Sequence, residues 1–418
     1  MAKTLVYQIY LFGFLEKEVI SKYNRFCDKG AIQTATQHLP LVQNLGADVV
    51  WLGPIFKSPW CDHGYDIANH YWVEPNFGSI EEFDAFVKKA HQLGLKVIID
   101  LVLNHTSTAH KWFHGQPDYY YWSNQNRPSW KNLFNGGSAW YYDEKSGEYY
   151  LHLFHHTQAD LNWFPHGPQG GVNSDLVKEF QRIIDYWVQE HNVDGFRLDV
   201  PQSINKDLSA DEFQFEDALF GDQAIEVINA VFQGRENLFL IMECFDPTMG
   251  ELVKRYVDST PVDFVMNVLL KDEINHGSKK FLESLNQQAQ IPGFMLELES
   301  HDAPRFLSRG ITPEEEIWWM FNSDVEGVCL FQGQELGLTN PSKKELSDNI
   351  LLALDVQTAM RFIMGEDLDD LRPVSRANAR IKLPLEAYES QLQNPSSYFN
   401  LTKRWIERWR NPDQKELW

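Results

Sequence analysis

The sequence predicts an α/β fold, a (β/α)8 (TIM) barrel, and three observations support the prediction. The chain has 418 residues, a length that suits one large barrel or two to three smaller domains. Eight short apolar, β-branched runs recur along it, and helical patterns follow most of them. Strands that alternate with helices indicate a parallel sheet, and eight such units favour a closed barrel over an open doubly wound sheet.

The expected elements follow in order along the chain. The first four strands cover residues 5–12, 48–52, 96–102 and 193–200. Helical patterns come after them at residues 31–46, 79–94, 174–191 and 221–233. The last four strands cover residues 237–243, 261–267, 293–299 and 327–335. A further helix is expected near 247–256, after the fifth strand, and the last helix of the chain is expected at 396–409.

The helix expected at 79–94 has the clearest ends. Ser79 can cap it, and Glu82 stands three residues later, as a capping box requires. Phe83, Phe86 and the apolar residues after them recur at helical spacing, and Gly94 can end the helix.

Two segments depart from the repeat. Residues 106–165 follow the third strand and are rich in Trp, Tyr and Phe, well above the 14% aromatic content of the chain. We expect them to form a subdomain over the barrel mouth, inserted into a barrel made of residues 1–105 and 166–418. Its rings can stack on a flat ligand, or pack together as a small core; each interpretation suits any single ring equally. The polar segment 336–393 is a long excursion before the last helix.

Composition and charge exclude several classes of partner. A net charge of −22 argues against nucleic acid or an anionic membrane, and no run of about 18 apolar residues exists to span a bilayer. The four cysteines are scattered and form no CxxC pair, and the N-terminus has no apolar signal segment. These features favour a cytoplasmic protein, and we expect neither a metal ion nor a cofactor.

The heptapeptide DGFRLDV at 194–200 places two charges on one face of a predicted buried strand. Side chains alternate along a strand, so Arg197 and Asp199 share a face. Burying them is costly unless they are paired or functional, and a structural salt bridge is the simpler explanation. Other polar residues, however, also fall at predicted strand ends, where the active sites of such barrels lie. They are Asp100, Asn104, His105, Glu243, His301, Asp302 and Arg305, with Asp62, Tyr65 and Asp66 in the loop after the second strand.

This set of side chains suits hydrolysis of a glycosidic bond. One carboxylate attacks the anomeric carbon, a second protonates the leaving oxygen, and others bind hydroxyls of the sugar. We expect Asp199 to be the nucleophile, with Arg197 keeping it ionised. Glu243 follows an apolar run, so burial and nearby negative charge should raise its pKa and let it act as an acid.

Four segments together resemble the α-amylase family of retaining glycoside hydrolases. DLVLNH, GFRLDV, the glutamate of MECF and SHD are similar to the four barrel motifs of that family, in the same order. The resemblance spans about residues 5–410. It implies that Asp199 is the nucleophile, Glu243 the general acid/base and Asp302 the stabiliser of the transition state. It also implies that the −1 sugar subsite is lined by His105, Arg197, His301, Tyr65 and Asp66.

Finer features resemble the oligo-1,6-glucosidase branch of the family. They are QADLN (158–162), YYLHLF (149–154), FQGQELGLTN (331–340) and SRANAR (375–380). Phe154 ends the second of these and joins the expected substrate-binding set. Val200, directly after the nucleophile, is similar to members that prefer α-1,6 bonds. Relatives of this type have a closed pocket, and Asp62 and Arg305 are our candidate pair to close it.

The sequence also departs from the family pattern. SHD stands where NHD is usual, so Ser300 replaces a longer amide side chain. The first loop lacks a DGxGD-like calcium segment, and we read Asn104 as a supporting residue rather than a metal ligand. The C-terminal β-sandwich of the family has no counterpart in this chain, and a homo-oligomer is one way to cover the apolar surface it usually covers.

The sequence therefore predicts a cytoplasmic exo-α-glucosidase that removes terminal α-1,6-linked glucose from short oligosaccharides. Its partner is a small carbohydrate substrate. A glucosyl transferase, a sucrose isomerase or a glycoside phosphorylase would use the same intermediate and stay open as alternatives. A catalytically inactive binding relative is the third, less favoured, interpretation.

Overall fold

The computed structural model describes residues 3–14, 30–133, 136–342 and 376–412. Eight parallel strands close into a barrel in the order β1-β15-β14-β13-β12-β11-β5-β2, as the sequence predicts. The strands are β1 (Thr4–Tyr10), β2 (Val49–Gly53), β5 (Lys96–Val102), β11 (Gly195–Asp199), β12 (Phe239–Cys244), β13 (Phe264–Asn267), β14 (Phe294–Glu297) and β15 (Gly327–Phe331). Each expected strand lies in the barrel, and the eighth ends four residues earlier than its apolar run.

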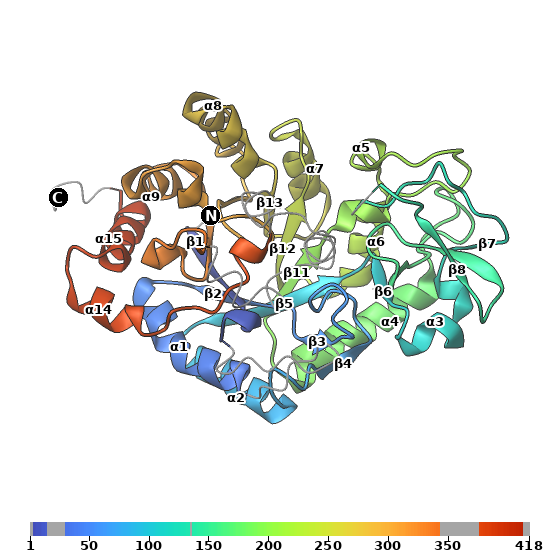
Figure 1. The fold of residues 1–418 in the computed structure, drawn as a ribbon, viewed down its shortest axis with the longest axis horizontal. Helices are drawn as coiled ribbons and strands as arrows, with labels where there is room; N and C mark the ends of the chain where they lie inside the picture. Colours follow the sequence, from blue (N-terminus) through green and yellow to red (C-terminus); the bar gives the residue numbers. More distant parts are fainter. Residues whose placement is uncertain (1–2, 15–29, 134–135, 343–375, 413–418) are drawn as a thin grey trace.

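Helices surround the barrel, and Figure 1 shows them around the central strands. They are α1 (Ala31–Leu45), α2 (Ile80–Gln92), α4 (Ser174–Asp185), α6 (Gln223–Phe232), α7 (Glu251–Ser259), α8 (Ser278–Gln288), α9 (Pro313–Phe321), α14 (Ala387–Gln393) and α15 (Tyr398–Arg410). The predicted capping box of α2 is present, since the Ser79 side chain accepts from the Glu82 N–H and the Glu82 side chain accepts from the Ser79 N–H. The expected helix 174–191 is α4 continued by a π-helical turn, Tyr186–Glu190.

The core has two layers. Alternate strand residues such as Val6, Trp51, Ile98 and Met295 fill the barrel interior. The other face of the strands packs against the helices in a larger core. Because side chains alternate across each strand, one sequence run supplies both layers.

The segment after β5 holds short strands and one short helix. β6 (His105–Ser107) pairs with β10 (Gln158–Asp160), and β9 (Glu148–Leu151) lies between β7 (Trp122–Ser123) and β8 (Trp140–Asp143). Together with α3 (Lys111–Gly115), β7 and β8 occupy one end of the long axis in Figure 1. Several of its rings form a small core of their own, which includes Tyr121, Trp130 and Trp140. For these residues the core interpretation is confirmed, whereas Phe154 faces the cavity described below.

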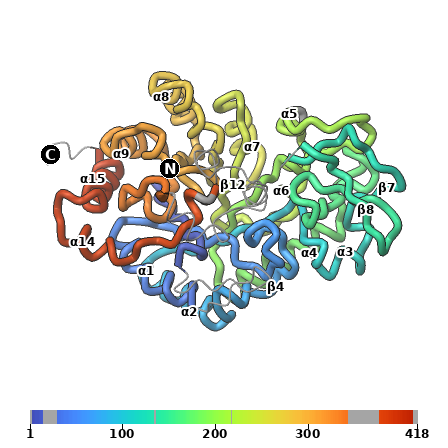
Figure 2. The backbone as a smooth tube through the Cα atoms, in the orientation of Figure 1, coloured from blue at the N-terminus to red at the C-terminus, as the bar shows by residue number. Residues whose placement is uncertain are grey.

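The C-terminal part of the chain returns to its beginning. Helix α15 contacts α1 and α9, and Figure 2 shows the red C-terminal helices beside the blue N-terminal ones. Most of the expected excursion 336–393 lies outside the described residues. Among the described residues, no helix is long and apolar enough to cross a membrane.

Candidate active site

The C-terminal ends of the barrel strands surround a cavity of about 740 Å³. Ten of the twelve predicted site residues line it: Asp62, Tyr65, His105, Phe154, Arg197, Asp199, Val200, Glu243, His301 and Asp302. Asp66 and Arg305 do not. These residues come from separate strands and loops, so the closed barrel is what assembles them.

Arg197 is the centre of the charged cluster. Its Nη1 donates to Asp199 Oδ1 at 2.5 Å and to Asp100 Oδ1 at 2.7 Å, while Nη2 pairs with Glu243 Oε2. The guanidinium also lies 4.9 Å from the centre of the Trp51 ring. One buried cation thus holds the carboxyl groups of three neighbouring strands side by side.

Val200 has an unusual backbone conformation for a β-branched residue. Its φ of 37° and ψ of 48° are left-handed, a conformation that costs free energy and persists only where the surroundings impose it. In this conformation its N–H donates to Glu243 Oε1 at 2.8 Å. The strained residue after Asp199 therefore orients the second carboxyl group.

Burial raises the pKa of both Asp199 and Glu243. At Asp199 the carboxylates of Glu243 and Asp100 add to this rise, and Arg197 opposes it. We expected Arg197 to keep Asp199 ionised, but desolvation and the neighbouring negative charges outweigh that single cation. Since two close carboxyl groups share one guanidinium, they favour binding one proton between them. The rise at Glu243 agrees with the expectation for an acid.

Asp302 has the opposite electrostatics. Burial raises its pKa, but Arg376, His301 and Arg380 together hold the pKa well below its usual range. Arg376 Nη2 lies 2.5 Å and Arg380 Nη2 2.8 Å from its Oδ1, and His301 Nε2 lies 2.8 Å from its Oδ2. This carboxylate is ionised in the free protein.

His301 is fixed from both sides. The Gln8 amide lies 2.7 Å from Nδ1, and the Tyr65 hydroxyl lies 2.7 Å from Nε2. Burial lowers the pKa of His301 to about 4, so the ring is neutral. With the Gln8 N–H donating to Nδ1, the ring proton is on Nε2 and faces Asp302.

The two residues outside the cavity have structural partners. Arg305 Nη1 donates to Glu299 Oε2 at 2.8 Å and to the Gln332 carbonyl at 2.9 Å, and the side chain is buried below the rim. The expected pairing of Asp62 with Arg305 is therefore wrong. Asp66, also expected at the subsite, is buried and accepts from Ser58 Oγ at 2.7 Å and from the Asp62 N–H at 3.0 Å. It braces the loop that presents Asp62 and Tyr65.

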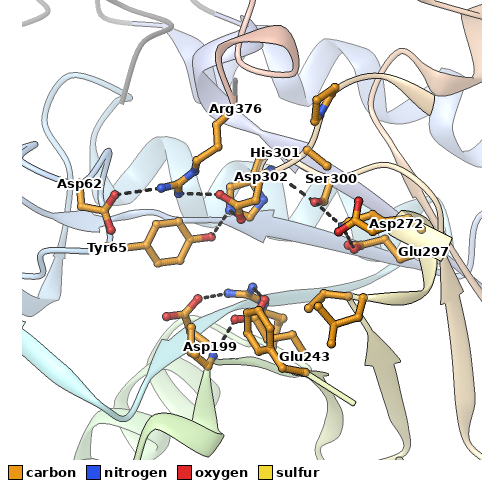
Figure 3. Close-up of a pocket in the computed structure, with 18 of the residues that line it drawn as sticks. Asp62, Tyr65, Asp199, Glu243, Asp272, Glu297, Ser300, His301, Asp302 and Arg376 are labelled. Carbon is orange, nitrogen blue, oxygen red and sulfur yellow. Dashed lines mark hydrogen bonds and ion pairs between the residues drawn. The ribbon is translucent and has the colours of Figure 1, made fainter. Parts of the chain in front are cut away.

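Arg376 occupies the place that we gave to Arg305. Its Nη1 lies 3.5 Å from Asp62 Oδ1 and its Nη2 reaches Asp302, so it bridges two sides of the cavity (Figure 3). The sequence offered one indication of this role, because Arg376 lies in the SRANAR segment that resembles the oligo-1,6-glucosidase branch. No local pattern, however, shows which arginine reaches the cavity. Gln158 of QADLN was also missed. Its Nε2 lies 2.9 Å from His105 Nε2 and donates to Asp62 Oδ2 at 3.0 Å.

Asn104 does not line the cavity but contacts a residue that does, as expected for a supporting residue: its Nδ2 lies 3.1 Å from His105 Nδ1. Asn104 Oδ1 accepts from Lys206 Nζ at 2.6 Å, and the same ammonium lies 3.0 Å from Asp160 Oδ2. This buried lysine joins the barrel to β10. Over the described part of the chain, no group of three or more His, Cys, Asp or Glu residues is arranged to hold a metal ion.

Comparison with known protein families identifies the family to which this architecture belongs. The family described as the alpha amylase catalytic domain matches residues 16–380. The chain belongs to the α-amylase family. It is a glycoside hydrolase, and the barrel with its ring of acidic residues is the catalytic domain of that family.

Individual relatives of this α-amylase family protein have several specificities. This chain is 37% identical to an oligo-1,6-glucosidase from Parageobacillus thermoglucosidasius, over 99% of this chain and 79% of that protein. It is 32% identical to the trehalose-6-phosphate hydrolase of Bacillus subtilis, over 93% of this chain and 74% of that protein. A crystal structure of the Bacillus licheniformis trehalose-6-phosphate hydrolase superimposes with a TM-score of 0.77, at 28% identity, over 98% of this chain and 83% of that one.

Ser300, which stands where the resemblance to the family led us to expect asparagine, has two hydrogen-bond partners. Its Oγ accepts from Lys271 Nζ at 3.1 Å and from the Asp302 N–H at 3.3 Å. Lys271 also donates to Glu297 Oε2 at 2.8 Å. An ammonium group therefore steadies the shorter side chain, and through it the backbone that carries Asp302.

Proposed function

We propose that this protein is a retaining exo-α-glucosidase that hydrolyses terminal α-1,6-linked glucose from short oligosaccharides. The observation that carries the exo assignment is the Arg376 bridge between Asp62 and Asp302 (Figure 3). A charged bridge at this position stops a sugar chain from continuing beyond the non-reducing end. The cavity then accepts one terminal sugar on this side of the catalytic carboxyl groups.

In the first step Asp199 attacks the anomeric carbon, and the proton of Glu243 passes to the glycosidic oxygen. Asp199 Oδ1 is held by Arg197, which leaves Oδ2 to form the bond. The aglycone leaves as an alcohol, and glucose stays as an ester on Asp199. In the second step the Glu243 carboxylate takes a proton from water, whose oxygen attacks the same carbon and releases Asp199.

Retention is supported by the shared guanidinium. Retaining glycosidases have carboxyl groups about 5–5.5 Å apart, against about 6.5–9.5 Å in inverting enzymes. Carboxyl groups bound to the two terminal nitrogens of Arg197 favour the shorter separation. Asp302, kept ionised by its cations, is suited to bind sugar hydroxyls and to stabilise positive charge at the anomeric carbon.

The α-1,6 preference is supported by Val200, which lines the cavity next to Asp199, and by the 37% identical oligo-1,6-glucosidase. Hydrolysis of trehalose 6-phosphate is a second candidate, because relatives at 32% and 30% identity have that name. It would use the same two-step chemistry. The two candidate reactions share the nucleophile and differ in the sugar that leaves.

The test is glucose release from isomaltose and maltose in parallel, with and without added phosphate. We expect preferential cleavage of isomaltose, indifferent to phosphate. Release of a sugar phosphate would instead indicate a phosphorylase. Asp199→Ala and Glu243→Gln should each lower kcat by at least about 1,000-fold with an unchanged far-UV spectrum. Normal turnover by either variant would rule out this mechanism.

A further inference from the structure

The cavity has a second charged wall that the catalytic scheme does not use. It begins in η5 (Leu270–His276), the turn that follows β13. In the closed barrel, β13 stands four strands from β2, so η5 lies opposite the loop that carries Asp62 and Tyr65. Figure 3 shows Asp272 and Glu297 on the far side of the cavity from Asp62, beyond Glu243.

The position relative to Glu243 identifies this side. Glu243 is the acid in the proposed mechanism, so the aglycone leaves on its side of the cavity. Arg376 closes the other side. A sugar that occupies the space next to the bond being cleaved therefore faces the η5 wall.

Two ion pairs form this wall, which we call the aglycone wall: Lys271, Asp272, Glu297 and Arg309. Lys271 Nζ lies 2.8 Å from Glu297 Oε2, and both side chains are buried. Arg309 Nη1 lies 2.9 Å from Asp272 Oδ1, and the Asp272 side chain is 56% exposed. All four residues line the cavity.

The charges of the cavity do not suit an anion. Its lining includes six carboxylates and four cations. The four cations are Arg197, Lys271, Arg309 and Arg376, and within the described residues each of them contacts a carboxylate. Sugar hydroxyls both donate and accept hydrogen bonds, so paired charges can serve them. A phosphate dianion requires cations that are not already neutralised.

We propose that the aglycone wall binds the departing sugar and selects an uncharged sugar over a phosphorylated one, with Asp272 as the residue that decides. This inference rests on the proposed function and narrows its substrate class. Asp272 neutralises Arg309 from the exposed edge of the cavity. Removing its charge leaves Arg309 as a cation that faces the aglycone.

The experiment compares trehalose with trehalose 6-phosphate, which differ only by the phosphate. The measured quantity is the ratio of kcat/KM for the phosphorylated to the plain sugar, or of their inhibition constants against p-nitrophenyl α-glucoside where turnover is slow. We expect the wild type to prefer the plain sugar by about ten-fold. Asp272→Asn should shift the ratio toward the phosphorylated sugar by at least about five-fold.

Asp258→Asn is the matched control. Asp258 on α7 is 57% exposed and pairs with Lys254, so the substitution removes a comparable charge outside the cavity. It should leave the ratio at its wild-type value. A wild type that prefers the phosphorylated sugar, or an Asp272→Asn ratio within about two-fold of wild type, would overturn the inference.

Failure of the proposed function has a different signature. If the wild type does not cleave p-nitrophenyl α-glucoside or isomaltose, the α-glucosidase assignment fails. The preference of the wall is then read from calorimetric titration of the same two sugars into wild type and Asp272→Asn. A shift in the binding ratio would still support the wall, and an unchanged ratio would reject it.

Discussion

At the scale of single residues, the site is governed by which cation contacts which carboxylate. Arg197 serves Asp199, Glu243 and Asp100 at once, and their pKa values rise together because one guanidinium cannot offset burial for all of them. Asp302 contacts Arg376 and Arg380 as well as His301, and its pKa falls. The same side-chain type thus has opposite proton affinity at two places in one cavity.

Val200→Thr is expected to shift the preference of the protein toward α-1,4 linkages. Threonine keeps the branched Cβ, so the left-handed backbone and the N–H bond to Glu243 should persist. The added hydroxyl changes only the surface that meets the aglycone. The measurement is the ratio of kcat/KM for isomaltose and maltose, with Val177→Thr on α4 as the control. An unaltered ratio would remove the role assigned to Val200.

Arg376→Ala is expected to lower kcat/KM for isomaltose by at least about 100-fold and to move the acidic limb of its pH profile upward. The reason is that Arg376 is the strongest of the cations that depress the pKa of Asp302. When it is removed, Asp302 binds its proton at higher pH and loses its negative charge. The pH profile of kcat/KM measures this shift.

Arg376→Lys separates charge from shape. It keeps the positive charge, so its acidic limb should lie closer to that of the wild type. Arg182→Gln, a change on the exposed face of α4, serves as the surface control. An acidic limb that is identical in wild type and Arg376→Ala would contradict the proposed link to Asp302.

At the scale of elements, β11 shows how a strand positions chemistry. It pairs with β5 on one side, where Arg197 lies opposite Asp100, and with β12 on the other. The pairing therefore brings Arg197 and the three carboxyl groups it contacts, those of Asp199, Asp100 and Glu243, onto three adjacent strands. Gly195 begins this strand, at a point where the backbone of β12 approaches closely.

Gly195→Ala is expected to destabilise the protein by at least about 3 kcal/mol and to lower kcat. An added Cβ would stand 1.8 Å from the Phe239 carbonyl oxygen, so β11 and β12 would have to separate. Urea denaturation and kcat for isomaltose check this. Gly115→Ala is the control, since a Cβ there meets nothing within 4 Å. Equal stability of the two variants would refute the packing argument.

At the scale of the whole molecule, packing buries several histidine side chains. His38 on α1 is buried between Tyr7, Phe14 and Tyr388, and burial lowers its pKa to about 3. The folded state therefore keeps this ring neutral. The unfolded chain binds its proton near pH 6.5.

Because the folded state keeps His38 neutral, acid should make the folded protein less stable. A base with a depressed pKa contributes stability above pH 6.5, and this contribution is lost as the pH falls toward 3. Between pH 6.5 and 5 the loss is about 2 kcal/mol for one such ring. The free energy of unfolding of His38→Gln should fall less steeply with acid than that of the wild type, as urea titrations at several pH values measure. His166→Gln, at an exposed site, is the control, and equal slopes for wild type and His38→Gln would contradict the prediction.

Local patterns in the sequence predicted the eight strands, most of the helices around them and the barrel edge at which the charged residues lie. They did not predict α8 and α9, the helices that follow the sixth and seventh strands. The predicted features depend on local periodicity, on caps such as Ser79, and on the rule that parallel strands end at one edge. The family motifs then pointed to Asp199, Glu243 and Asp302 as candidates. All three do face one cavity.

Which long side chains reach that cavity depends on contacts that exist only in the folded chain. Asp62 pairs with Arg376, 314 residues away, while Arg305, close to Asp302 in sequence, turns down to Glu299. The burial of Asp66 and the raised pKa of Asp199 likewise exist only in the folded chain. Contacts between distant segments and the loss of water are properties of the packed barrel, and no local pattern encodes them.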